Sequence, residues 1–319
     1  MPTPSLTPGS LTRRSALMAA AALPLATALP LATALPRPAR AAAEKMGPSL
    51  PTHHRFTLGG FEVVTLLAGS RVSDKPQETF GLNASPEDFA ALAEANFLPA
   101  DQTRNFFTPT LINTGSELVL FDTGLAPEGI TAALTAAGYS PDQVDVVVLT
   151  HMHGDHIGGL ANDSGARSFA KARYVTGAAE FDHWAKAGNE GFDTKVKPLA
   201  AETTMLAEGG TVASGITALA AFGHSPGHMA YRIESEGKAL ILTADTVNHY
   251  VFSLQRPDWE VRFDMDKAQA AATRKSLLGM IAADRLPFIG YHMPFPALGY
   301  LEAQGEGFRL VPASYQMTL

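Results

Sequence analysis

The feature that most constrains the fold is the apolar run VDVVVLT at residues 144–150, followed directly by the polar run HMHGDH at 151–156. β-Branched residues without polar alternation are typical of a strand that is covered on both faces. The polar run begins where this strand ends, which is where α/β proteins usually place their functional sites. We therefore expect a buried strand with a cluster of polar side chains directly after its carboxyl end.

Strand-like and helix-like segments are mixed along the whole chain. SPED at residues 85–88 predicts a helix start, because a serine cap, an early proline and acids in the first turn suit a helix N-terminus. No internal repeat or linker divides the chain beyond its first forty residues, so we expect one α/β domain of layered sheets and helices. We predict helices at 85–97, 128–137, 178–186 and 267–283, and strands at 110–113, 118–122, 144–150, 172–175, 216–221, 230–234, 239–243 and 288–291.

The N-terminal segment has the pattern of an export signal. Paired arginines in TRRS, at residues 12–15, precede an Ala/Leu-rich run with two copies of LPLATA and small residues suited to cleavage. The paired arginines indicate the twin-arginine route, and three prolines in the apolar run disfavour a membrane-spanning helix. We predict a signal peptide at residues 1–43, cleaved between residues 28 and 43, a single folded domain at 44–319, and a periplasmic location.

Composition limits the classes of partner and of metal ligand. The chain carries 24 basic and 31 acidic residues; without residues 1–43 the basic residues fall to 20, which leaves a formal charge of −11. An acidic chain without a basic stretch disfavours nucleic acids and anionic membranes, and it favours a small neutral substrate. The chain contains no cysteine. A metal site must therefore use histidine and carboxylate ligands.

The run HMHGDH offers four such ligands within six residues. His151 and His153 project to the same side of an extended segment, and Gly154 allows a sharp turn before Asp155 and His156. This density of donors at a strand end predicts a metal site.

A second pair of histidines lies in GHSPGH at residues 223–228. His224 and His228 are four residues apart, but the intervening proline and glycine disfavour a helix that would present both to one ion. The residues themselves leave open which of the two is a ligand.

The HxHxDH pattern resembles the signature of the metallo-β-lactamase superfamily. The superfamily's other elements follow in order: FDTG at residues 121–124, GHSPGH, Asp245 at the end of ALILTAD, and His292 at the end of LPFIGYH. This resemblance implies an αββα sandwich, in which two mixed sheets pack face to face with helices outside. RNFFTP at 104–109 and HMPFP at 292–296 are similar to the methyl parathion hydrolase-like branch, which contains phosphotriesterases, lactonases and arylesterases, commonly exported.

The resemblance implies two divalent metal ions, most simply Zn²⁺, with Co²⁺, Mn²⁺ or a mixed pair as alternatives. It assigns His224 rather than His228 as a ligand, and it leaves Asp122 and His228 to orient or support the ligands. The implied ligands are His151, His153 and His224 for one ion, Asp155, His156 and His292 for the other, and Asp245 as a bridge between them.

The implied mechanism uses a hydroxide shared by the two ions, which attacks a carbonyl carbon or a phosphorus. Asp155 is the expected proton shuttle, and Asp245 is essential because it joins the two sites. We expect lactones or aryl esters as substrates, with organophosphate triesters as a second class. The alternatives are an enzyme that is primarily a phosphotriesterase and a non-catalytic metal-binding protein on the same fold.

Four residues are candidates for the substrate pocket: Phe106, Phe107, Trp184 and His249. Phe106 and Phe107 are adjacent, so both cannot face the same side of one strand. His249 follows the bridging aspartate by four residues, so contact with substrate, a hydrogen bond to a ligand and simple exposure are all open. The branch is also compatible with a homodimer, and we expect no membrane span after removal of the signal.

Overall fold

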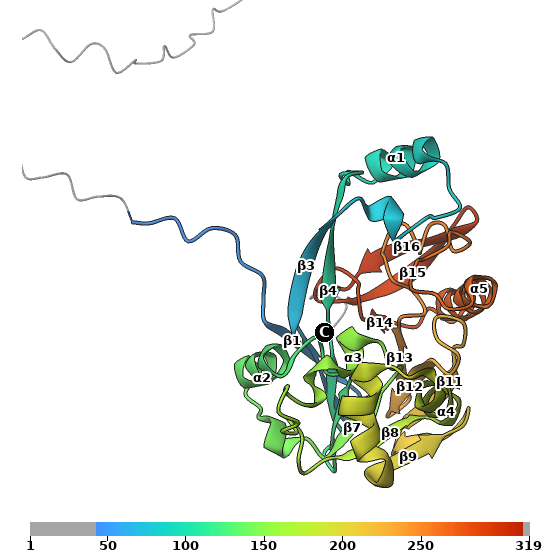
Figure 1. Ribbon diagram of the computed structural model, residues 1–319. Coiled ribbons are helices and arrows are strands. Elements are labelled where there is room, and N and C mark those ends of the chain that lie inside the picture. Colours follow the sequence, from blue (N-terminus) through green and yellow to red (C-terminus); the bar gives the residue numbers. More distant parts are fainter. Residues whose placement is uncertain (1–42, 315–319) are drawn as a thin grey trace, which may run out of the picture. The chain divides into compact units, whose positions relative to one another are not determined.

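Two seven-stranded sheets and five α-helices form the framework of the chain from Ser49 onward, which is one compact unit (Figure 1). The computed structural model describes residues 43–314. The predicted signal peptide therefore lies outside the described residues, except for Ala43. Among the described residues, no helix is long and apolar enough to cross a membrane.

The first sheet is mixed, with four parallel strands on one side. β6, β7, β8 and β9 are parallel neighbours, whereas β1, β2, β5 and β6 are joined by antiparallel pairs. Its order is β1 (His53–Leu58), β2 (Phe61–Leu66), β5 (Thr110–Asn113), β6 (Leu118–Phe121), β7 (Val146–Leu149), β8 (Arg173–Gly177) and β9 (Thr203–Leu206).

The second sheet is also mixed, with one parallel pair, β13 and β14. Its order is β10 (Thr211–Ala213), β11 (Ile216–Ala220), β12 (Met229–Ser235), β13 (Lys238–Ala244), β14 (Phe288–Gly290), β15 (Leu298–Gln304) and β16 (Gly307–Pro312). A separate antiparallel ribbon consists of β3 (Gly69–Asp74) and β4 (Gln102–Phe107). The helices are α1 (Pro86–Ala95), α2 (Pro127–Ala136), α3 (Gly154–Ile157), α4 (Ala178–Ala187) and α5 (Lys267–Ala283).

Strand β7 shows why its sequence lacks polar alternation. Val146 and Val148 belong to the core between the two sheets, which also contains Tyr231 of the second sheet. Val147 and Leu149 point the other way, into a second core shared with helices α2 and α4. Both faces of the strand are therefore buried, and the predicted α/β class and αββα sandwich are confirmed.

Most predicted elements are present, with small differences at their ends. The Ser85 hydroxyl caps α1 by accepting a hydrogen bond from the amide of Asp88, as SPED predicts, but the helix ends at Ala95. The segment after His153 forms one turn of helix, α3, where we expected only a sharp turn.

The ribbon of β3 and β4 was not predicted. The side chains of β3 are mostly exposed and polar, so they show no hydrophobic period, and the partner strand lies about thirty residues further along the chain. This strand was missed because a long-range pairing determines it.

The strands that precede the site end at neighbouring positions. β6 and β7 are parallel in the first sheet, and β13 and β14 are parallel in the second. The residues that follow their carboxyl ends therefore collect at one edge of each sheet.

Candidate metal centre

The structure brings together all seven residues that the resemblance assigns as ligands. They form three overlapping groups, and within each group the nitrogen and carboxylate oxygen atoms lie within 4.8 Å of one another. The groups are His151, His153 and His224; His151, His156 and Asp245; and Asp155, His156 and His292.

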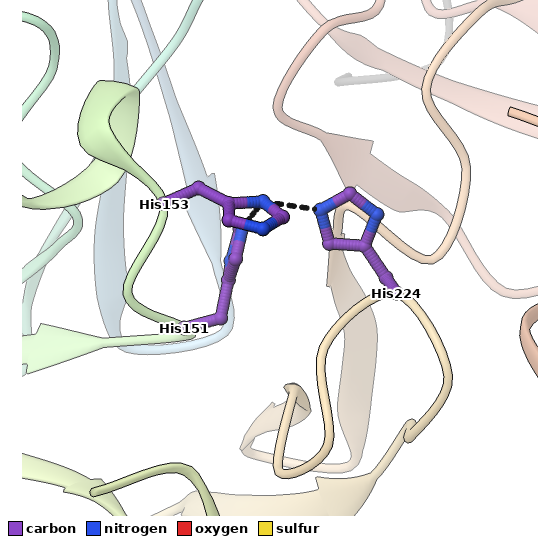
Figure 2. Close-up of side chains that lie close together, drawn as sticks. All are labelled: His151, His153 and His224. Carbon is purple, nitrogen blue, oxygen red and sulfur yellow. Dashed lines mark hydrogen bonds between the residues drawn. The ribbon is translucent and has the colours of Figure 1, made fainter. Parts of the chain in front are cut away.

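The three-histidine group joins the two sheets (Figure 2). His151 and His153 follow β7, whereas His224 lies in the loop after β11. His153 Nδ1 lies 3.0 Å from His151 Nε2 and 2.9 Å from His224 Nε2, so the three rings converge through one nitrogen each. Burial, reinforced by the neighbouring histidines, lowers the pKa of His151 well below its usual value and that of His153 to about 3. Both rings are therefore neutral donors at physiological pH.

Asp245 lies between the three-histidine group and the group of Asp155, His156 and His292. Its Oδ2 is 3.1 Å from His292 Nε2 and 3.4 Å from His224 Nε2, and its Oδ1 is 3.4 Å from His156 Nε2. One carboxylate thus faces histidines of all three groups. This position suits a ligand shared by two ions.

Negative charge dominates around His156 and His292. Burial opposes the charged form of His156, but the carboxylates of Asp245, Asp122 and Asp155 raise its pKa well above the usual value. In the same way, burial lowers the pKa of His292 while Asp245 and Asp155 raise it, to a net value of about 10. These carboxylates therefore stabilise positive charge next to His156 and His292. A bound cation would supply such a charge.

Two buried donor atoms fit a divalent cation. His156 Nε2 and Asp245 Oδ1 have no hydrogen-bond partner among the described residues, although buried polar atoms are nearly always paired. The donor set contains imidazole nitrogens and carboxylate oxygens, which suit Zn²⁺ and other first-row divalent metals. The residues present therefore fit the pair of ions that the resemblance implies.

Asp122 lies behind His156, on the side away from the donor cluster. Its Oδ2 accepts a hydrogen bond of 2.8 Å from His156 Nδ1, and its two oxygens also accept from the amide and hydroxyl of Thr150 at 2.9 Å. This arrangement directs His156 Nε2 toward the cluster, so Asp122 is placed to orient this histidine.

Asp264 contacts His224 as Asp122 contacts His156, through the ring nitrogen that faces away from the donor cluster. The sequence did not indicate this residue. Asp264 Oδ1 lies 2.9 Å from His224 Nδ1, and its Oδ2 accepts a 2.6 Å hydrogen bond from the buried guanidinium of Arg274. It is forty residues from His224 and belongs to no motif, so no local signal could have found it.

His228 uses both of its ring nitrogens within the protein. Nδ1 donates to the carbonyl of Ala221 at 3.1 Å, and Nε2 accepts from the amide of Asp245 at 3.0 Å. Neither nitrogen is free for a metal in this conformation, whereas His224 Nε2 points into the cluster. In this geometry His224, and not His228, directs a ring nitrogen at the other candidate ligands.

The family model described as the metallo-beta-lactamase superfamily matches residues 108–288, which is more than half of the chain. The chain belongs to this superfamily. Among solved structures, the dizinc quorum-quenching lactonase AidC in complex with a product is 24% identical, with 82% of this chain and 98% of that chain covered at a TM-score of 0.76. The hydrolase AbOPH is 22% identical, with 84% and 99% covered at a TM-score of 0.77. At this identity, the likeness to both structures is one of fold.

Curated relatives match only short segments. The anti-Pycsar protein Apyc1 of Paenibacillus sp. (strain J14) is 35% identical over 68 residues, which is 21% of this chain and 26% of the relative. Ribonuclease Z of Pyrococcus furiosus is 46% identical over 50 residues, 16% of this chain and 15% of the relative. The chain thus spans about a quarter or less of the length of these relatives.

Two of the predicted pocket aromatics lie against histidines of the candidate metal centre. The ring of Trp184 is 5.8 Å from that of His153, and the ring of Phe107 is 5.7 Å from that of His292, both edge to face. Phe106 contributes its backbone, because its carbonyl accepts a 2.8 Å hydrogen bond from His292 Nδ1. The β4 strand therefore holds the last histidine in place.

His249 is buried in a third, smaller core that includes Phe80 and Phe252. Its Nδ1 accepts hydrogen bonds of 3.1 Å from the amides of Val251 and Phe252, and its ring stacks on Phe252 at 4.3 Å. Its Nε2 lies 3.5 Å from the hydroxyl of Thr103. These contacts give His249 a place in the packing of the loop after Asp245.

Proposed function

We propose that the chain is a metal-dependent hydrolase that acts on lactones or aryl esters. The observation that carries the proposal is the set of overlapping donor groups, with Asp245 between them and with buried donor atoms left unpaired. Two divalent ions held there would lower the pKa of a shared water and polarise the scissile carbonyl group. One ion would be held by His151, His153 and His224, the other by Asp155, His156 and His292, and Asp245 would contact both.

Asp155 is the residue best placed to move a proton. Its side chain is 24% exposed, against 4% for Asp245, so it lies on the open side of the cluster. Burial raises its pKa, but His156 and a hydrogen bond from His292 outweigh this and hold it at about 2. The carboxylate is therefore ionised at neutral pH, and its exposed side would give it access to a proton that moves from the attacking water to the leaving alkoxide.

The surroundings of the site favour a neutral, partly apolar substrate. Trp184 borders the three-histidine group and Phe107 borders the group that contains His292. The chain is acidic, which disfavours a polyanion such as RNA. Solved structures that share the fold include a lactonase with a homoserine product and an N-acyl homoserine lactone hydrolase with such a product. These neighbours support a lactone as the first substrate class to test.

A phosphotriesterase is the second candidate, and it rests on the resemblance of RNFFTP to the methyl parathion hydrolase-like branch. The structure places this segment against the site, because Phe107 contacts His292. The same donors would serve attack at phosphorus, so the shape of the pocket decides between the two substrate classes.

A substrate panel tests the proposal. Dihydrocoumarin, acyl-homoserine lactones, phenyl acetate and a nitrophenyl phosphotriester would be assayed before and after chelation, and again after Zn²⁺ is restored. We expect lactone or aryl ester hydrolysis that is lost with the metal and recovered with it, and that is abolished in Asp245→Ala but kept in Asp142→Ala, an exposed control. Metal binding without hydrolysis of any substrate would instead support the non-catalytic alternative.

We further propose that the protein is exported by the twin-arginine route. Replacing Arg13 and Arg14 by lysine should leave the precursor in the cytoplasm, as measured by cell fractionation. Unchanged delivery to the periplasm would contradict this route.

A further inference from the structure

Glu180 is a buried carboxylate that no motif in the sequence indicates. It lies in the first turn of α4 with 0% of its surface exposed, and its two oxygens accept four hydrogen bonds. Oε1 accepts from the amide of Met152 at 3.0 Å and from the indole nitrogen of Trp184 at 2.7 Å. Oε2 accepts from the hydroxyl of Ser225 at 2.7 Å and from the amide of Gly227 at 2.8 Å.

The two oxygens hold two different ligand-bearing loops. Met152 stands between His151 and His153, so Oε1 fixes the backbone that presents both rings. Ser225 directly follows His224, so Oε2 fixes the loop that presents the third ring. A single carboxylate thus spans the gap between the loop after β7 and the loop after β11.

Gly227 makes this contact sterically feasible. A Cβ atom at residue 227 would lie 2.0 Å from the backbone nitrogen of Glu180 and 2.5 Å from its Cα. Those distances are far shorter than any tolerated contact, and the obstacle is backbone rather than a movable side chain. The second glycine of GHSPGH is therefore required for the loop to approach α4 closely enough to donate its amide to Glu180.

We propose that Glu180 is a positioning residue for the three-histidine group, and that it sets the affinity of that group for its metal ion. None of its four hydrogen bonds reaches Asp155, His156 or His292, so the other group should depend on it much less. The inference rests on the proposed metal-dependent function, because it concerns how one of the two ions is held.

Glutamine at this position tests the carboxylate with little change of shape. An ionised carboxylate only accepts hydrogen bonds, whereas an amide presents one accepting oxygen and one donating NH₂ group. In either orientation, Glu180→Gln turns that NH₂ group toward N–H groups that cannot accept, either the Met152 amide and the Trp184 indole or the Gly227 amide. At least one hydrogen bond to a ligand-bearing loop is therefore lost whichever way the amide turns.

The experiment is a titration of the chelator-treated full-length protein with Co²⁺ in competition with a chromophoric chelator. We expect the wild-type chain to bind two equivalents. Glu180→Gln should bind one equivalent with unchanged affinity and the other 10- to 100-fold more weakly, which is the usual effect of losing a group that orients metal ligands. Asp182→Asn, an exposed acid on the same helix, is the matched control and should bind as the wild type does.

Ser225→Ala provides a second, milder variant, because it removes one hydrogen bond on the His224 side and leaves the carboxylate in place. It should weaken the same equivalent several-fold, and it decides the matter if Glu180→Gln does not fold. Unchanged affinity for both equivalents, or equal weakening of both, would overturn the positioning role. A wild-type chain that binds no Co²⁺ would overturn the proposed function itself, and this inference with it.

Discussion

His249 should make the protein less stable in mildly acidic solution. Burial lowers its pKa from 6.5 to about 3 in the folded state, whereas in the unfolded chain it titrates near 6.5. Between these two values the unfolded state binds the additional proton, so acid favours unfolding. The free energy of unfolding therefore falls as the pH drops below 6.5. The contribution of His249 to this fall is about 2 kcal/mol between pH 7 and pH 5.

The variant His249→Asn removes the titrating group and keeps an acceptor for the amides of Val251 and Phe252, which His249 Nδ1 binds in the wild type. At pH 7 the variant should be less stable by about 1–3 kcal/mol, because it loses the ring contacts with Phe80 and Phe252. At pH 5 this difference should shrink by about 2 kcal/mol, since only the wild type has to release a proton on folding.

Urea denaturation at pH 7, 6 and 5 measures both quantities, with the fluorescence of the two tryptophans as the signal. The control is Phe252→Leu, which loosens the same small core but removes no titrating group, so its difference from the wild type should not change with pH. A His249→Asn difference that stays constant from pH 7 to pH 5 would show that His249 is not held neutral by burial.

Two further predictions concern His224 and the residues around it. Arg274→Met should lower the free energy of unfolding by about 3–5 kcal/mol, because it leaves the buried carboxylate of Asp264 without its 2.6 Å partner. Urea denaturation measures this loss. A loss below about 1 kcal/mol would mean that the ion pair of Arg274 and Asp264 contributes little to stability. His224→Ala should lose one metal equivalent by elemental analysis, because its Nε2 faces the cluster, whereas His228→Ala should keep two and melt at a lower temperature. The reverse result would exchange the roles of these two histidines.

The strand ends that carry the candidate ligands were recognisable in the sequence, whereas the assignment of His224, Asp245 and His292 as ligands came from the resemblance to the superfamily. The run at 144–150 and the segments ending at Asp245 and His292 are apolar and short, and the polar residue that follows each one marks the strand end. Such signals are local, so a single sequence contains them. The same reasoning explains why strands β5 and β6 were found almost residue for residue.

Residues that act across long stretches of the chain were not predictable. Glu180 contacts Ser225 forty-five residues away, and Asp264 contacts His224 forty residues away. Neither acid differs in its neighbours along the sequence from an ordinary surface acid, and only the folded chain reveals that both are buried. The β3–β4 ribbon was missed for the same reason, because its pairing is not encoded by any short period.

The candidate ligands come from two separate halves of the chain. Residues 151–156 follow a strand of the first sheet, whereas His224, Asp245 and His292 follow strands of the second. During synthesis the complete donor set cannot exist before residue 292 has been made and both sheets have formed. An ion that binds only this assembled set adds to the free energy of unfolding, by about 2.7 kcal/mol when it is present at a hundred times its dissociation constant. The concentration of metal ions around the protein would then help to determine which fraction of the molecules keeps the two sheets packed together.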